Sequence, residues 1–451
     1  MDKGFLFECR IIENHDEAYA IWKERDIRNA TVLHVDAHSD FTNFSECFYM
    51  TIGNYLNYAW SEEIINCVIW VIPDMTFRDS EKMNVVLSRL TDFTITSVLN
   101  LRVDLVLKLD SRKKLVITSI EYIEKLVLET VDSLFLIDID IDFFMNPDIR
   151  NVYSYFHLDS FWLDMNFFCK IIQKIIEKCT IMTVSKSIIG GYTPLIYSYI
   201  SSYIFEFVTK RSNVFFMIDR AVRALTKKQY QQATRYFHME FDKGNRTLTC
   251  LLGLVYSYVG IGDWRLAKMY YSMVASHYKQ YETYFFPVFG LIKEHMYEEA
   301  ESLVKIWLKL DSSSQQAILY RIKILLLCNC NEEKKIEALL TKITDENTCF
   351  EKSYICIQYY RMIGSNVKAI QCGKRVLKYL RINETPTWVG QISSFEKHKN
   401  HGIVFANIHY LLACIYYDMG DYRQAVYNAK ISKRIGLRND TISKILEHGA
   451  D

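Results

Sequence analysis

The chain has 451 residues, of which 50% are hydrophobic and 24% are charged. This composition excludes a disordered chain, and the length predicts more than one domain. The formal net charge is +1, so the overall charge does not favour nucleic acid or an acidic membrane as a partner.

Targeting and membrane signals are missing from the printed sequence. Residues 1–4 lack the basic and apolar regions of a signal peptide. The longest apolar stretch, residues 188–208, contains glycine, proline and several polar residues, which predicts a strand end, a loop and a buried helix rather than a membrane span. The twelve cysteines show no zinc-site spacing, so we expect free thiols in a reducing cytoplasm.

The first predicted strand covers residues 5–13, and a helix is expected from Ala18 to Glu24. His15 stands where the strand gives way to the helix. A capping or surface histidine is common at such a place, and a metal ligand is the alternative.

A second buried strand begins at Ala30 and carries a run of alternating polar side chains at its end. These are His34, Asp36, His38 and Asp40. Residues two apart on a strand share one face, so the side chains converge at the carboxyl end of the strand. Carboxylate and imidazole together suit a divalent ion such as manganese, iron or zinc. A solvated strand end is the alternative.

A third stretch repeats the acidic theme. After a helix near residues 52–60, a strand at 67–72 and more α/β alternation to about residue 120, residues 134–142 predict an apolar strand. It carries Asp138, Asp140 and Asp142 at alternate positions. Like charges on one face of a buried strand repel one another, and a bound cation removes that repulsion.

A helix at 160–179 and a last strand at 180–184 complete the pattern. Strands that alternate with helices predict a three-layer α/β domain with a mainly parallel sheet and helices on both faces. Ligands of such sheets bind beyond the carboxyl ends of the strands. His15, residues 34–40, residues 138–142 and the loop 185–194 all fall at such ends.

From about residue 212 a helical repeat takes over. Tyr230-x-x-Ala233, Trp264-x-x-Ala267 and Tyr297-x-x-Ala300 recur at spacings of 34 and 33 residues. Fuller copies read Gly262-Asp263-Trp264 and Gly420-Asp421-Tyr422, weaker ones lie near Ala338 and Ala369, and a polar insertion covers 383–401. The pattern resembles tetratricopeptide repeats. We therefore expect domains at 1–208 and 212–451, the second an all-α solenoid.

Solenoids of this kind usually bind a peptide or protein on a concave face, or associate with a second copy. An architectural domain that only packs on the rest of the chain is the alternative.

Residues 5–195 resemble the arginase-like ureohydrolase family, most closely a small branch that includes peptide arginases. The resemblance rests on His15, on Asp36-Ala37-His38-Ser39-Asp40, and on Asp140-Ile141-Asp142, with Asp138-Ile139-Asp140 as an alternative register. It implies an arginase-like fold that holds two manganese ions per chain.

The resemblance also implies roles for individual residues. One ion would be bound by His15, Asp36, Asp40 and Asp140, and the other by His38, Asp36, Asp140 and Asp142. Asp36 and Asp140 would bridge them. The catalytic candidates are Asp138 or Asp142, whichever the register leaves free to move a proton, and His34, which either orients a ligand or has no role.

Two departures from that family bear on the substrate. The loop from Phe41 to Leu56 has no histidine, and Ser185-Lys186-Ser187 after the last strand offers no acid to clamp a guanidinium. With the short first domain, these favour arginine in a peptide, converted to ornithine with release of urea, over free arginine. The alternatives are a non-catalytic repeat scaffold with a structural or regulatory metal domain, and an amide hydrolase of the same fold.

Overall fold

The computed structural model describes residues 7–41, 50, 52–99, 101–130, 134–145, 162–188, 193–209, 215–293, 295–328, 332–344, 349–380, 402–435, 437 and 439–448. Within this part of the chain, every strand precedes residue 186. The chain divides into two compact units, the first extending to Pro287 and the second beginning at Val288. The predicted boundary at 208–212 marks the change from sheet to helices, whereas this division falls later, inside the helical region.

Eight strands form a single sheet. Their bounds are β1 (Glu8–Ile12), β2 (Ala30–Val35), β3 (Ile65–Val71), β4 (Phe93–Leu99), β5 (Arg102–Leu107), β6 (Asp110–Thr118), β7 (Phe135–Asp140) and β8 (Cys179–Ser185).

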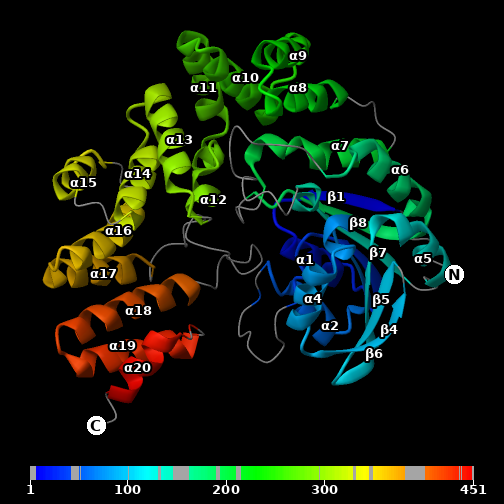
Figure 1. Ribbon diagram of the computed structural model, residues 1–451, viewed down its shortest axis with the longest axis horizontal. Helices are drawn as coiled ribbons and strands as arrows, with labels where there is room; N and C mark the ends of the chain where they lie inside the picture. Colours follow the sequence, from blue (N-terminus) through cyan, green and yellow to red (C-terminus); the bar gives the residue numbers. More distant parts are fainter. Residues whose placement is uncertain are drawn as a thin grey trace. The chain divides into compact units, whose positions relative to one another are not determined.

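The strand order is β1-β8-β7-β2-β3-β6-β5-β4. Every neighbouring pair from β1 to β6 is parallel, and β5 is antiparallel to both β6 and β4 (Figure 1). The predicted mainly parallel α/β sheet is therefore confirmed. Residues 93–118 differ from the expected α/β alternation, because Lys108 and Leu109 turn the chain straight back from β5 into β6.

Helices of the sheet-bearing part are α1 (Asp16–Glu24), α2 (Tyr55–Ser61), α3 (Asp74–Phe77), α4 (Ser80–Arg89), α5 (Ile123–Thr130), α6 (Met165–Ile175) and α7 (Tyr199–Val208). Short 3-10 turns occur at η1 (Ile120–Tyr122), η2 (Ile141–Phe144), η3 (Ile176–Lys178) and η4 (Leu195–Tyr197).

Both faces of the central strands are buried. Val32 and Leu136 pack in one core with residues of α1, α2 and α4. Leu33 and Ile137 point to the opposite face and are also fully buried. The helices α5, α6 and α7 pack against one another in sequence, and α7 contacts β1 and β8. Burial on both faces explains why four of the six residues in each of β2 and β7 are apolar, and it makes the polar exceptions informative.

Helices alone make up the rest of the described chain. They are α8 (Phe216–Thr226), α9 (Tyr230–Asp242), α10 (Leu248–Ile261), α11 (Trp264–His277), η5 (Lys279–Tyr284), α12 (Val288–Lys293), α13 (Tyr297–Leu310), α14 (Gln315–Leu327), α15 (Glu333–Leu340), α16 (Cys349–Met362), α17 (Asn366–Leu380), α18 (Gly402–Asp418), α19 (Tyr422–Ile435) and α20 (Asp440–His448).

Consecutive helices pack as pairs, namely α8 with α9, α10 with α11, α16 with α17 and α18 with α19. Gly262 follows α10 with φ +89°, and Gly420 follows α18 with φ +76°, a left-handed conformation that glycine adopts without a Cβ clash. The alanines three residues into the next helices, Ala267 and Ala425, are fully buried. The predicted helical repeat is therefore confirmed.

Two parts of the repeat prediction need separate mention. Ala338 is exposed on α15, so it does not fill the buried small-residue position that Ala369 fills on α17. The insertion at 383–401 lies outside the described residues.

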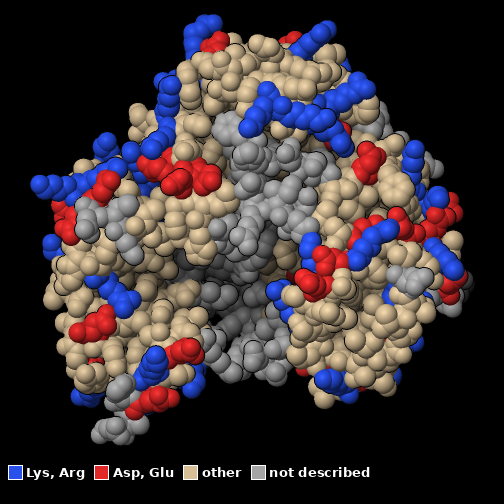
Figure 2. Space-filling model, viewed as in Figure 1, with Lys and Arg blue, Asp and Glu red and all other residues tan. Residues whose placement is uncertain are grey.

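Charges of both signs are spread over the face of the molecule drawn in Figure 2, which matches the near-neutral net charge. Among the described residues, no helix is both long enough and apolar enough to cross a membrane. The cysteines whose state the structure gives are free thiols, as expected.

Candidate metal centre

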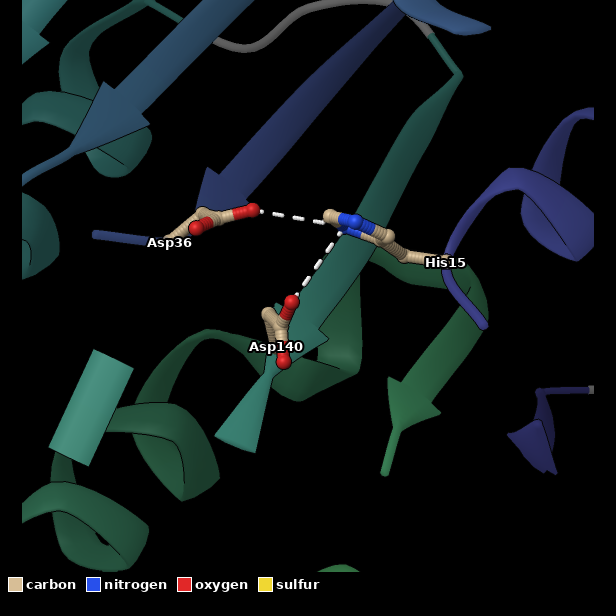
Figure 3. Close-up of side chains that lie close together, drawn as sticks. All are labelled: His15, Asp36 and Asp140. Atoms are coloured by element: carbon tan, nitrogen blue, oxygen red, sulfur yellow. Dashed lines mark ion pairs between the residues drawn. The ribbon is translucent and has the colours of Figure 1, made fainter. Parts of the chain in front are cut away.

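The carboxyl ends of β2 and β7 lie side by side because these strands are parallel neighbours. Asp36 follows β2, Asp140 ends β7, and His15 lies just before α1. Figure 3 shows the imidazole of His15 between the carboxylates of Asp36 and Asp140. Three residues far apart in sequence therefore meet at the strand ends, as the sequence predicts.

His15 forms the centre of the first ligand group. Its Nδ1 lies 3.0 Å from Asp40 Oδ2, 3.3 Å from Asp36 Oδ2 and 3.5 Å from Asp140 Oδ2. All four side chains are at most 5% exposed. Three carboxylates around one buried nitrogen form a strongly acidic, water-poor environment.

A second group forms around His38. Its Nδ1 lies 2.9 Å from Asp142 Oδ2 and 3.4 Å from Asp36 Oδ1, and its backbone N–H donates to Asp36 Oδ1 at 2.6 Å. The His38 side chain is 49% exposed, whereas that of Asp142 is 4% exposed. This group is therefore buried on its acidic side and open on its imidazole side.

Asp36 belongs to both groups, because Oδ2 faces His15 and Oδ1 faces His38. His34 adds a third imidazole, with Nε2 3.4 Å from Asp36 Oδ2 and 3.8 Å from Asp40 Oδ2. Asp36 therefore belongs to three groups of potential metal ligands, and within each group the ligand atoms lie within 4.8 Å of one another. The groups are His15, Asp36 and Asp140; His34, Asp36 and Asp40; and Asp36, His38 and Asp142.

Several buried atoms of the cluster have no hydrogen-bond partner within the described chain. They are His15 Nδ1, His34 Nε2, Asp36 Oδ2, Asp40 Oδ2 and both carboxylate oxygens of Asp142. Buried polar atoms are rarely left unpaired, because desolvation is then uncompensated. Hard carboxylate oxygens with imidazole nitrogens are a donor set for divalent cations. The residues of the cluster are thus suited to bind divalent metal ions.

The electrostatics agree with this interpretation. Burial raises the pKa of Asp40, Asp140 and Asp142, and neighbouring carboxylates raise it further. Burial by itself lowers the pKa of His15, but the surrounding carboxylates outweigh it and raise that pKa well above its usual value. Without a cation, the cluster therefore retains protons to balance its negative charge.

For Asp36 the balance is reversed. Burial raises its pKa, but the neighbouring imidazoles of His15, His38 and His34 outweigh burial and lower that pKa well below its usual value. Asp36 is thus the carboxylate that stays ionised at the centre of the cluster.

Loop geometry fixes Asp140. Ser187 Oγ donates to Asp140 Oδ2 at 2.7 Å, and the N–H of Asp142 donates to Oδ1 at 3.1 Å. Ser187 and Asp40 adopt φ of +46° and +49°, which costs energy for residues other than glycine. Ser187 N–H also donates to the carbonyl of Glu13 at 2.9 Å, so the loops before α1 and after β8 are tied together.

A row of polar residues lies one step deeper in the sheet. His34 pairs in register with Asp138, and Asp138 pairs with Thr183. Asp138 accepts short hydrogen bonds from Tyr55 at Oδ2 and from Thr183 at Oδ1, and its Oδ2 is 3.6 Å from His34 Nδ1. Both oxygens of Asp138 are thus occupied by the protein itself.

A cavity of about 230 Å³ opens onto the cluster. It is lined by His15, Ala37, His38, Ser39, Asp40, Ile52, Gly53, Trp70, Val86, Arg89, Asp140 and Asp142. Of the residues selected from sequence, His34, Asp36 and Asp138 are not among the described lining residues, whereas Asp142 is.

The sequence predictions therefore have distinct outcomes in space. His15, Asp36, His38, Asp40, Asp140 and Asp142 come together in one cluster, with His34 beside them. Sequence reasoning missed Tyr55, Thr183 and Arg89. Only Thr183 gave a signal, because it lies two residues before Ser185 on a buried strand whose remaining residues, apart from Thr180, are apolar.

Comparison with known proteins assigns no family. No family model matches the chain, and no curated protein matches it. Among solved structures it is similar to a tetratricopeptide repeat protein from Parabacteroides merdae ATCC 43184, with 13% identity, coverage of 57% of this chain and 96% of that one, and a TM-score of 0.29.

It is also similar to the APC/C hetero-tetramer Cut9-Hcn1, with 14% identity, coverage of 67% of this chain and 54% of that one, and a TM-score of 0.30. At such scores neither structure adds to the description of the fold, which rests on the strands and helix pairs given above.

Proposed function

We propose that the chain is a metal-dependent hydrolase that holds two divalent cations, with manganese preferred, and acts on arginine residues of a peptide. Water adds to the guanidinium carbon, the bond from that carbon to the side-chain nitrogen breaks, and urea and ornithine result. The observation that carries the proposal is Asp36, whose two oxygens face two different imidazoles, His15 and His38. A carboxylate shared by two ligand groups is what a two-cation site requires.

The proposed ligands follow the two groups. His15, Asp36, Asp40 and Asp140 would hold one cation. His38, Asp36, Asp140 and Asp142 would hold the other, so that Asp36 and Asp140 belong to both sets. The distances support the set around His15 and the grouping of His38 with Asp36 and Asp142. Asp140 is included in the second set because the family resemblance implies it. When bound, the two cations would lower the pKa of a shared water and polarise the guanidinium group.

Side chains of the protein would bind the substrate and transfer the proton. The carboxylates of Asp40, Asp140 and Asp142 line the cavity and attract the cationic guanidinium group. Asp142 Oδ1 has no hydrogen-bond partner among the described residues, so it can accept a proton from the attacking water and return it to the leaving amine. We therefore assign two roles to Asp142: Oδ2, which faces His38, would help to hold the cation, and Oδ1 would transfer the proton.

Asp138 and His34 receive a positioning role instead. Tyr55 and Thr183 occupy both oxygens of Asp138, which in turn lies beside His34. His34 then presents Nε2 to Asp36. A chain of this kind orients ligands without touching the substrate.

The choice of a peptide is supported by two features. After β8 the chain presents Ser185, Lys186 and Ser187, and Lys186 forms an ion pair with Glu13 at 3.3 Å. This loop therefore lacks the acidic residue with which enzymes of the resembled family that act on free arginine bind the guanidinium group. Paired helices follow the sheet, an architecture that commonly holds peptides.

The test combines metal analysis with urea release. Purified protein loaded with manganese should contain about two ions per chain and release urea from arginine peptides but not from free arginine. The Asp36→Asn variant is the matched control, and it should neither retain two ions nor release urea from arginine peptides. Two ions without urea from any substrate would keep the site and reject the reaction. No retained metal after loading would leave the repeat scaffold as the better account.

A further inference from the structure

The wall of the cavity carries one unusual residue. Three aspartates line the cavity, and the guanidinium side chain of Arg89 lines it as well. Arg89 ends α4 and is exposed. The acidic residues come from the ends of β2 and β7, so cation and anions are supplied by different elements.

The other arginines described between residues 7 and 209 each form an ion pair. They are Arg10, Arg25, Arg28, Arg78, Arg102 and Arg112. Arg89 forms neither an ion pair nor a side-chain hydrogen bond within the described chain, although it shares a cavity with Asp40, Asp140 and Asp142. Its five N–H donors are thus free to bind a ligand.

We propose that Arg89 binds a carboxylate which the substrate carries in addition to its guanidinium group. The inference rests on the proposed function, because the acidic strand ends then take the guanidinium and Arg89 takes the anion. Val86, one turn earlier on α4, and Ile52 and Trp70 supply apolar lining for the methylene groups between the two charges. The substrate is therefore a molecule with both charges, rather than any arginine residue.

Two sources would supply such a carboxylate in a peptide. One is an acidic residue next to the arginine, and the other is the C-terminal carboxylate of a peptide that ends in arginine. A planar guanidinium binds either one through two parallel hydrogen bonds, which a lysine ammonium cannot reproduce.

The bland alternative is that Arg89 only stabilises the end of α4, where a cation interacts favourably with the helix dipole. A lysine at this position would retain that effect and lose the paired hydrogen bonds. The Arg89→Lys variant therefore separates the two accounts, and Arg89→Gln removes the charge altogether.

The probes are short ornithine peptides, which resemble the product and need no turnover. Binding is measured by calorimetry on the full chain loaded with manganese and on the metal-free chain. One pair carries aspartate or asparagine after the ornithine, with an amidated C-terminus. A second pair ends in ornithine as the free acid or as the amide. Urea release from the corresponding arginine peptides is recorded in parallel.

The full chain should bind the acidic member of at least one pair about tenfold more tightly, the size of one charge-assisted hydrogen-bond pair at a partly exposed site. The pair that shows the preference identifies the source of the carboxylate. Arg89→Gln should abolish the preference, and Arg89→Lys should retain only part of it. Arg112→Gln, a charge loss at an 80% exposed side chain paired with Asp110, should retain it in full.

The proposal is overturned if the full chain shows no preference in either pair, or if Arg89→Gln retains the preference. It is also overturned if Arg112→Gln removes the preference as effectively as Arg89→Gln. A preference that depends on Arg89 without urea from any arginine peptide would support the role of Arg89 and reject the proposed reaction. Failure of the two is thus distinguishable.

Discussion

The atoms that contact each carboxylate separate four aspartates that look equivalent in sequence. Asp36 faces two imidazoles, and Asp140 is held by Ser187. Neither carboxylate oxygen of Asp142 accepts a hydrogen bond in the described chain, and Asp142 lines the cavity, whereas both oxygens of Asp138 accept hydrogen bonds from neutral hydroxyls. Asp138 is also in none of the three ligand groups and is not among the described lining residues, so it belongs to the supporting layer.

This difference gives a prediction about metal content. Asp36→Asn should reduce bound manganese from about two ions per chain to fewer than one, because it removes the shared ligand. His38→Ala should leave about one ion, because the His15 group is not touched. The measurement is elemental analysis after dialysis, with circular dichroism to check the fold. Equal losses in the two variants would contradict the shared role of Asp36.

Asp138→Asn should act differently from both. The amide replaces one acceptor with a donor that faces a hydroxyl, so we expect a loss of about 1–3 kcal/mol in the free energy of unfolding. Metal should remain bound, with affinity weaker by about 10–100-fold. Denaturant titration and metal titration measure the two effects. Thr183→Val is the matched control, because it removes only one of the two hydroxyl donors and should cost less.

Without metal, stability should fall as pH rises. The raised pKa values of Asp40, Asp140 and Asp142 mean that the folded chain holds protons which the unfolded chain has already released above about pH 4. His15 and His38 also have raised pKa values, so their contribution is complete below about pH 6.5 and is lost as pH rises further. Both effects have the same sign.

Asp36 has the opposite dependence, but its lowered pKa confines that effect to acid pH, below about 4. Cations replace the protons of the cluster, so metal binding should tighten as pH rises. Melting temperatures with and without manganese should therefore diverge from about pH 5 to about pH 9. Parallel curves would show that the cluster does not bind the metal.

At the scale of elements, the regular spacing of residue types along the sequence was the reliable predictor of structure. Alternation along residues 34–40 predicted that the polar side chains converge, and they do, although β2 ends at Val35 and Asp36, His38 and Asp40 lie in the loop that follows it. The glycine and alanine spacing likewise predicted the helix pairs around Gly262 and Gly420. Tyr55 and Arg89 escaped notice, since their positions depend on how α2 and α4 pack on the sheet, which local period does not encode. The antiparallel turn at 108–109 was missed for another reason, because Lys108 and Leu109 are not the glycine, proline or asparagine residues that usually mark a turn.

The helix pairs depend on close approach at particular glycines. A Cβ atom on Gly253 of α10 would lie 2.2 Å from the ring of Phe237 on α9, which is fully buried. Gly253→Ala should therefore lower the free energy of unfolding by about 3 kcal/mol or more, because the ring cannot move aside. Thermal and denaturant unfolding measure the loss.

A second glycine serves as the control. Gly262→Ala meets no atom within 4 Å, and only its φ of +89° is unfavourable, so a loss of about 1 kcal/mol is expected. Combining Gly253→Ala with Phe237→Leu should recover part of the stability if the ring is the cause. A double variant that is merely the sum of the two single losses would contradict the overpacking argument.

For the whole molecule, the boundary between functions need not follow the boundary between strands and helices. Side-chain contacts connect residues on the two sides of the predicted boundary at 208–212. Tyr199 donates to Asp219 at 2.8 Å, and Arg223 lies 3.9 Å from Asp164. Tyr281 of η5 donates to Glu13 at 3.1 Å, two residues before the proposed ligand His15. The first helices thus brace the loop that carries His15, as the compact unit ending at Pro287 indicates.

Two shortened chains test this arrangement. A chain ending at Pro287 retains every contact named above and should keep about two manganese ions and urea release from short arginine peptides. A chain ending at residue 211 loses those contacts, so it should unfold at lower denaturant and bind metal more weakly. If α12–α20 hold the peptide, the chain that ends at Pro287 should turn over a long peptide substrate poorly and a short one normally. Equal behaviour of the two shortened chains would show that the helices up to η5 do not support the site, and the boundary at 208–212 would then divide the functions as well.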